Sequence, residues 1–90
     1  MDLVARKKRI ESRLKKALDP ISIEVRDDSK HHAGHQGIES GTKETHFYIK
    51  MRALSFKGLN KVMMHRKVYE LLQDEFDNGL HALELELGVN

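Results

Sequence analysis

Apolar residues recur every four positions near the start of the chain, and this spacing predicts an amphipathic helix. Ile10, Leu14 and Leu18 lie on one helical face, so we expect a helix over residues 2–18. The helix should end before Pro20, because proline disfavours the helical conformation in the residue that precedes it.

A second helix is predicted over residues 59–77. Asn78 and Gly79 should end it, since both residue types readily adopt the left-handed conformation that follows many helices. We expect the apolar stripe of this helix to face the core, with His65 at its centre as a packing residue. The stripe comprises Val62, Val68, Tyr69, Leu72 and Phe76.

Three further stretches alternate apolar and polar residues, as strands with one buried face do. The apolar positions are Ile21, Ile23 and Val25, then Phe47, Ile49 and Met51, and finally Leu83, Leu85 and Leu87. The order helix–strand–strand–helix–strand predicts an α+β fold, αββαβ, with a three-stranded mixed sheet. We interpret residues 1–90 as one such domain.

This order of elements also predicts how the strands pair. The first two strands should be antiparallel, whereas strand–helix–strand connections give parallel neighbours. The second and third strands would then begin at the same edge of the sheet. The long connection before the second strand and His81 before the third should share that edge. Helical rise would keep His65 about 16 Å from the end of its helix, and therefore away from this edge.

Composition excludes several classes of function. The chain has no cysteine, so it can form neither a disulfide framework nor a thiolate metal site of its own. It contains no nucleophile elbow, Walker loop or dinucleotide fingerprint, and we expect no enzymatic activity. No apolar run could span a bilayer, and neither a signal peptide nor a transit peptide is evident. We expect a cytoplasmic protein without a membrane partner, and the mitochondrial matrix and the nucleus remain alternatives.

Charge is unevenly distributed although the net charge is only +2. Seven of the eleven residues from 6 to 16 are Lys or Arg, whereas acids dominate residues 70–86. A basic segment can bind nucleic acid or an acidic partner. The interpretation that we prefer for this segment is the solvated face of a surface helix.

The histidines are the candidate metal ligands. His31, His32 and His35 form an H-H-x-x-H cluster in the glycine-rich connection, but this spacing matches neither a zinc finger nor the H-E-x-x-H motif. Taken alone, the cluster is better explained as a solvated loop. His46 should lie on the sheet face opposite the core, or at the edge. His81 should be partly buried beside Leu83 and Leu85, and burial would keep its ring neutral, the form that binds metals.

Four stretches in register resemble the BolA family: EVRDDSKHHAGH, ETHFYI, FKGLNKVMMHRKVYELLQDEF and HALEL. They are similar to the family's strand with its D-E-S and histidine-bearing loop, its T-H-F strand, its F-x-G…R-H-R-x-V-Y helix and its H-A-L strand. Order and spacing agree from about residue 6 to residue 87. Two positions depart from the pattern: Met64 replaces the usual arginine, and Asp28 replaces the usual glutamate.

The resemblance implies a fold akin to class II KH domains and partnership with a monothiol glutaredoxin. The two proteins would share a 2Fe–2S cluster, with the glutaredoxin cysteine and a glutathione thiolate as ligands on one side. Carried over by motif position, the ligands from this chain are His81 of H-A-L and His32 before Ala33, with His35 as the alternative loop ligand. The implied function is a non-enzymatic adaptor in iron–sulfur cluster trafficking or iron-redox regulation, monomeric and without cofactor when alone.

Two other functions stay open. Some BolA proteins are described as transcription regulators, so the main alternative is a DNA-binding regulator with a KH-like surface. That surface would use the basic residues 6–16 and a partner or nucleic-acid face formed by Lys57, Lys61, His65 and Arg66. A module that binds zinc alone is the third hypothesis.

Overall fold

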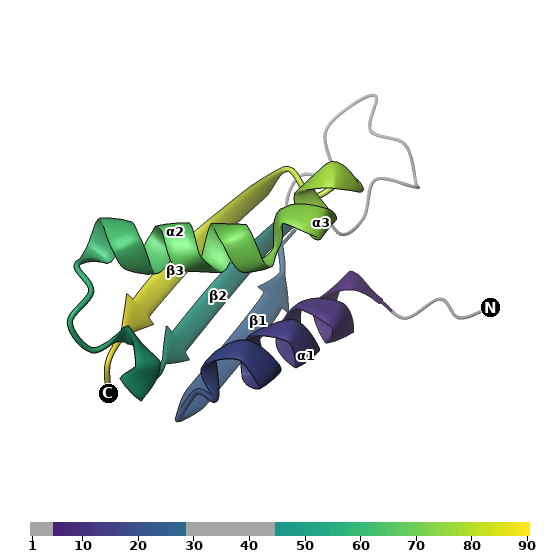
Figure 1. The fold of residues 1–90 in the computed structure, drawn as a ribbon. Helices are drawn as coiled ribbons and strands as arrows, with labels where there is room; N and C mark the ends of the chain where they lie inside the picture. Colours follow the sequence, from purple (N-terminus) through teal and green to yellow (C-terminus); the bar gives the residue numbers. More distant parts are fainter. Residues whose placement is uncertain (1–4, 29–44) are drawn as a thin grey trace.

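The structure is a computed structural model that describes residues 5–28 and 45–90. In this part of the chain the elements follow the predicted α+β order, with a short 3₁₀ helix and a split second helix in addition (Figure 1). They are α1 (Arg6–Leu18), β1 (Ser22–Asp27), β2 (His46–Arg52), η2 (Leu54–Phe56), α2 (Lys61–Leu71), α3 (Gln73–Asp77) and β3 (Ala82–Gly88).

The three described strands form one mixed sheet in the order β1-β2-β3. β1 pairs antiparallel with β2, and β3 pairs parallel with β2, as the order of elements predicts. His46, the first residue of β2, is the register partner of Ala82, the first residue of β3. The second and third strands therefore do begin at the same edge of the sheet.

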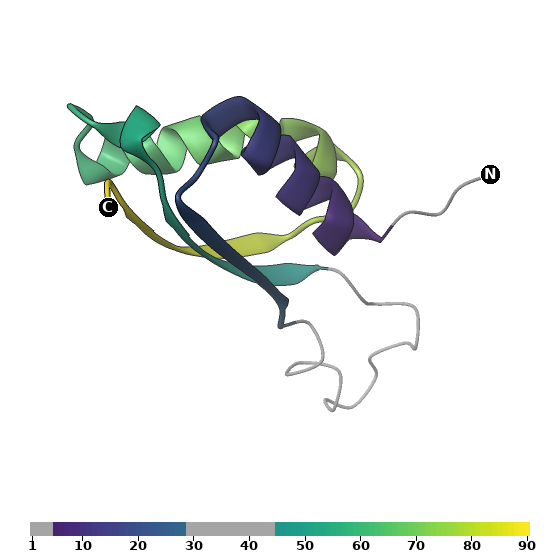
Figure 2. The ribbon, with the colours of Figure 1, turned by 90° about the horizontal axis from the view of Figure 1, so that it is seen from below.

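The described helices all lie on one face of this sheet, and the face that they leave uncovered is called the open face below (Figure 2). The central strand contributes Phe47, Ile49 and Met51, all almost fully buried, so its predicted alternation is confirmed. The edge strands follow the pattern less closely. Ile21 precedes β1 and is 59% exposed, so its predicted burial is wrong. Leu83 and Leu85 face the same side as the core residues of β2, but they are only partly buried because β3 has no neighbour beyond it in the described sheet.

The bounds of both predicted helices need correction. α1 starts at Arg6 rather than at residue 2, and residues 2–4 lie outside the described part. α2 starts at Lys61, because the Asn60 side chain accepts a hydrogen bond from the backbone N–H of Met63 at 2.9 Å. The predicted single helix also divides at Leu72, whose ψ of 15° departs from helical geometry.

The predicted core stripe of the second helix is confirmed at Val68, Leu72 and the partly buried Phe76, but it is wrong at Val62, His65 and Tyr69, which are exposed. The buried residues of α2 are Met64 and Val68, continued by Leu72 after the helix ends. Val62 is 64% exposed, and His65 is exposed rather than packed in the core. Met64, which departs from the family pattern, is therefore a core residue on the face toward the sheet.

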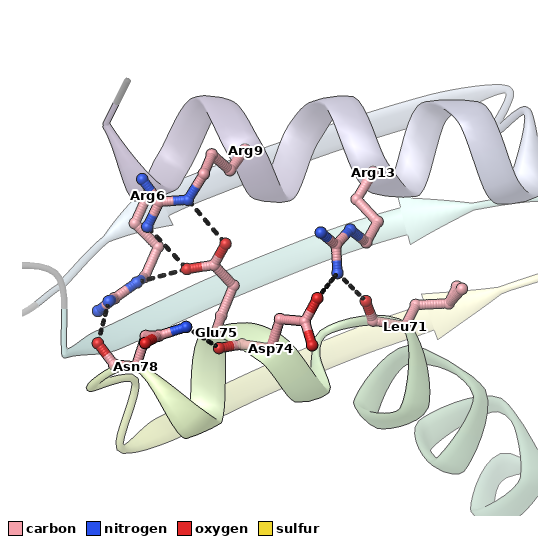
Figure 3. A network of polar contacts seen from close by, with 7 residues as sticks. All are labelled: Arg6, Arg9, Arg13, Leu71, Asp74, Glu75 and Asn78. Carbon is pink, nitrogen blue, oxygen red and sulfur yellow. Dashed lines mark hydrogen bonds and ion pairs between the residues drawn. The ribbon is translucent and has the colours of Figure 1, made fainter. Parts of the chain in front are cut away.

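A buried ion cluster joins α1 to α3 (Figure 3). Arg6 and Arg9 of α1 both donate hydrogen bonds to the Glu75 carboxylate of α3 at 2.8 Å. Arg6 also donates to the carbonyl of Asn78 at 2.7 Å. Arg6 and Glu75 are the buried charged residues in the described part of the chain. The preferred interpretation of residues 6–16 as a solvated face therefore fails for Arg6, although the lysines of α1 are exposed.

We expect Glu75→Ala to lower the free energy of unfolding by about 3 kcal/mol or more, because removal of one partner leaves the buried Arg6 guanidinium without its counter-ion. Urea denaturation measures this change. Asp74→Ala is the matched control, since Asp74 is an exposed carboxylate that pairs with Arg13 at 3.4 Å. Its removal should cost less than about 1 kcal/mol. Equal losses for the two variants would contradict the assigned role of Glu75.

The same cluster predicts a pH dependence of stability. Hydrogen bonds from Arg9 and Arg6 hold the pKa of the Glu75 carboxyl below its usual 4.5, although burial opposes them. A carboxyl whose pKa is depressed by folding stabilises the protein above its unfolded pKa, and this contribution disappears as the pH falls through the folded pKa. We therefore expect the stability difference between the protein and its Glu75→Gln variant to be constant near neutrality and to shrink below about pH 4.5. A difference independent of pH down to acid unfolding would contradict this.

Candidate metal edge of the sheet

Three segments meet at the edge where β2 and β3 begin. The carbonyl of Thr45 accepts backbone hydrogen bonds from His81 at 2.8 Å and from Ala82 at 3.1 Å. The backbone N–H of Asp28 donates to the carbonyl of His46 at 2.8 Å. Asp28 and Thr45 flank residues 29–44 in the sequence, so both attachment points of that segment lie at the edge that carries His81. His31, His32 and His35 belong to the segment and lie outside the described residues.

His46 and His81 lie side by side at this edge. Their ring centroids are 6.2 Å apart, and the ring planes differ by only 11°. Oγ1 of Thr45 lies 2.9 Å from Nδ1 of His46, within hydrogen-bonding distance. The sequence analysis predicts His46 on the open face or at the edge, but it does not predict that His46 lies next to His81. The predicted parallel pairing of the second and third strands implies this proximity, since parallel strands bring the residues at their starts together.

His81 differs from its prediction in one respect. It lies at the expected edge, but it is exposed instead of partly buried. β3 begins only at Ala82, so His81 precedes the pleated segment whose alternate side chains face the helices. The predicted partial burial of His81 is therefore wrong, and exposure makes its side chain accessible to a partner.

His65 is remote from this edge, as predicted. It lies in the second turn of α2, whereas α3, which follows the end of α2, is the helix near the start of β3 (Figure 1). The described residues hold no group of three or more His, Cys, Asp or Glu side chains arranged for a metal ion. Within the described residues, His46 and His81 would therefore offer a metal ion at most two ligands.

The open face of the sheet carries a network of paired polar side chains. The Tyr48 hydroxyl donates to the Glu86 carboxylate at 2.7 Å, which lowers the pKa of Glu86 and raises the pKa of Tyr48. The Arg26 guanidinium lies 4.4 Å from the centre of the Tyr48 ring and pairs with Asp28 at 2.7 Å. Asp28 directly follows β1 and donates to His46, so the network reaches the edge at which β2 and β3 begin.

A second surface surrounds α2. Lys57, Lys61 and Arg66 are exposed, as a nucleic-acid or partner surface would require. Arg66 also lines a groove of about 240 Å³, together with Leu59, Met63, Lys67 and Glu70. This surface combines cations with exposed apolar side chains and is separate from the metal edge. Among the described helices, none is both long and apolar enough to span a membrane.

Comparison with known proteins identifies the family. Residues 14–89 match the family model described as BolA-like protein. The chain is 44% identical over 81 residues to "Protein BOLA1, chloroplastic" of Arabidopsis thaliana, covering 89% of this chain and 51% of that protein. It is 43% identical to "SufE-like protein 1, chloroplastic/mitochondrial" of the same plant, covering 92% of this chain and 23% of the relative. The chain thus spans about half the length of the first relative and about a quarter of the second.

A bacterial relative and a solved structure extend the comparison. "DNA-binding transcriptional regulator BolA" of Haemophilus influenzae is 32% identical, covering 87% of this chain and 71% of that protein. The solved structure of BolA1 from Arabidopsis thaliana superimposes with a TM-score of 0.86 at 40% identity, covering 98% of this chain and 95% of that one. The family match, the relatives and the shared fold together establish that the chain belongs to the BolA-like family.

Proposed function

We propose that this protein is a non-enzymatic adaptor that binds a monothiol glutaredoxin and shares a 2Fe–2S cluster with it, in iron–sulfur cluster trafficking or iron-redox regulation. The observation that carries the proposal is the position of His81. Its side chain is exposed, and its backbone is hydrogen-bonded to Thr45, the residue that follows the histidine-bearing segment. Membership of the BolA-like family supports the same conclusion.

The side chains that could bind a cluster fit a cluster shared with a partner better than a cluster held by this chain alone. The chain has six histidines and no cysteine, so it can offer imidazoles but no thiolate. His81 and His32 would hold the cluster on this side, with His35 as the alternative loop ligand. Histidine ligands in place of cysteine raise the reduction potential of a 2Fe–2S centre. The missing thiolates would come from the glutaredoxin and from glutathione.

A DNA-binding regulator is the second candidate function. The name of the Haemophilus relative favours it, and so do the exposed cations Lys57, Lys61 and Arg66. Part of the basic α1 segment is unavailable for phosphate, because Arg6 and Arg9 bind Glu75 within the domain. Binding through phosphates would weaken steeply with salt, whereas a cluster-bridged complex would require iron and glutathione. The compartment stays a prediction, since the chloroplast and the mitochondrion are named only for relatives.

We expect the isolated protein to be monomeric and colourless after anaerobic reconstitution with iron and sulfide. With a monothiol glutaredoxin and glutathione, it should form a coloured heterodimer. Size-exclusion chromatography with light scattering and the visible absorption spectrum measure the two properties. A stable coloured cluster on the isolated chain would overturn the proposal.

The loop ligand can be identified by single alanine variants reconstituted with glutaredoxin. We expect His32→Ala and His81→Ala to change the visible spectrum and to speed cluster loss, because each removes one imidazole, while the partner's thiolates still permit association. His31→Ala and His35→Ala are the matched controls from the same segment. An altered spectrum with His35→Ala and not with His32→Ala would move the assignment to His35.

His65→Ala should leave the cluster spectrum unchanged, since α2 holds this exposed side chain away from the metal edge. Any effect should appear instead in the affinity for a partner that binds the α2 surface. Absorption and heterodimer affinity are measured on the same samples. Loss of the cluster signal in a folded, still heterodimeric His65→Ala protein would show that His65 is a ligand.

A further inference from the structure

We propose that His46 and His81 form a two-imidazole site for a single transition-metal ion such as Cu²⁺ or Ni²⁺. This site needs neither the histidines of residues 29–44 nor a glutaredoxin. The inference stands apart from the proposed function, because it concerns a metal ion bound by the isolated chain. It rests on the distance between the two rings and on the backbone that holds them.

The ring separation is close to the widest that two imidazoles on one ion can have. Ring nitrogens bind such metals at about 2.0 to 2.1 Å, and the centre of an imidazole lies roughly 1 Å behind its ligating nitrogen. Two rings on one ion have centroids at most about 6 Å apart, and this limit applies only when the two nitrogens face each other across the ion. The observed rings are stacked with centroids 6.2 Å apart, so both side chains must rotate to turn one nitrogen each toward a common ion.

The backbone on both sides of the pair is already fixed. His46 begins the central strand, and its carbonyl accepts the N–H of Asp28. The N–H of His81 donates to Thr45, the neighbour of His46. The Thr45 hydroxyl also contacts the His46 ring, as outer groups that orient metal-bound histidines do.

The donor type determines which ions the pair should prefer. Imidazole suits Cu²⁺, Ni²⁺ and Zn²⁺, and Cu²⁺ binds a given nitrogen site most tightly among the divalent ions of the first transition row. The described residues place no third His, Cys, Asp or Glu ligand here. The ion would therefore keep coordination positions for water or for a donor from another molecule, as open metal sites do.

The test uses the full chain with His31, His32 and His35 all replaced by Asn, titrated with Cu²⁺ and followed by calorimetry and pulsed electron paramagnetic resonance. The resonance spectrum counts the imidazoles bound to the copper. We expect one Cu²⁺ per chain with two imidazole ligands. His46→Gln or His81→Gln in this background should leave one imidazole and weaken binding about tenfold or more. His65→Ala is the matched control, an exposed histidine away from the edge, and it should change neither value.

A single-imidazole spectrum in the loop-substituted chain would overturn the inference, and so would unchanged binding after His46→Gln. Glutamine retains polar atoms that can contact Thr45, so the strand should remain intact, and circular dichroism checks this. If His46→Gln unfolded the protein, His81→Gln would still decide, because His81 is exposed and precedes β3. No glutaredoxin is present in any sample. The copper titration therefore gives the same answer whether or not the protein forms a cluster-bridged complex with glutaredoxin.

Discussion

The parallel pairing of β2 with β3 is the constraint on which the rest of the structure depends. Parallel neighbours need a connection that returns along the sheet, and α2 and α3 provide it while covering one face. Because the two strands start at the same edge, residues 35 positions apart in the chain, His46 and His81, become neighbours. An antiparallel third strand would have placed His81 at the opposite edge, away from residues 28 and 45.

The ion cluster around Glu75 stabilises the turn that leads from α3 to His81 and β3. Glu75 binds Arg6 and Arg9 through its side chain, and its backbone carbonyl accepts the N–H of Leu80, the residue before His81. Arg6 also holds the carbonyl of Asn78, and Gly79 has a φ of +117°, a conformation that residues with a side chain rarely adopt. The break in the helix at Leu72 produces the separate helix α3 that carries Glu75. The turn that delivers His81 is thus anchored to α1.

Hydrophobic periodicity predicts the helices and strands of this chain, but it does not predict contacts between residues far apart in the sequence. The alternation of β2 predicted its burial correctly because a central strand is covered along its whole length. In the first turn of α2 the pattern favours Val62 as the buried residue, whereas Met64 is buried, because Val62, Met63 and Met64 are consecutive apolar residues and permit more than one buried face. His81 was expected to be partly buried because alternation alone does not tell where an edge strand begins. The pairing of Arg6 with Glu75 joins residues 69 positions apart, and no periodicity encodes it.

The candidate site lacks thiolate ligands because the chain has no cysteine. This lack is the reason why the proposed function includes a partner protein. A rigid sheet edge presents two imidazoles, and the chain contains no thiolate to add to them. Divalent copper or nickel accepts such nitrogen donors together with water, whereas an iron–sulfur cluster prefers at least some thiolate ligands. The same edge would therefore bind different metals depending on what else supplies ligands. In the proposed arrangement, His46 and His81 would hold a single ion with water as the other ligand, whereas a 2Fe–2S cluster would require a second molecule that brings sulfur.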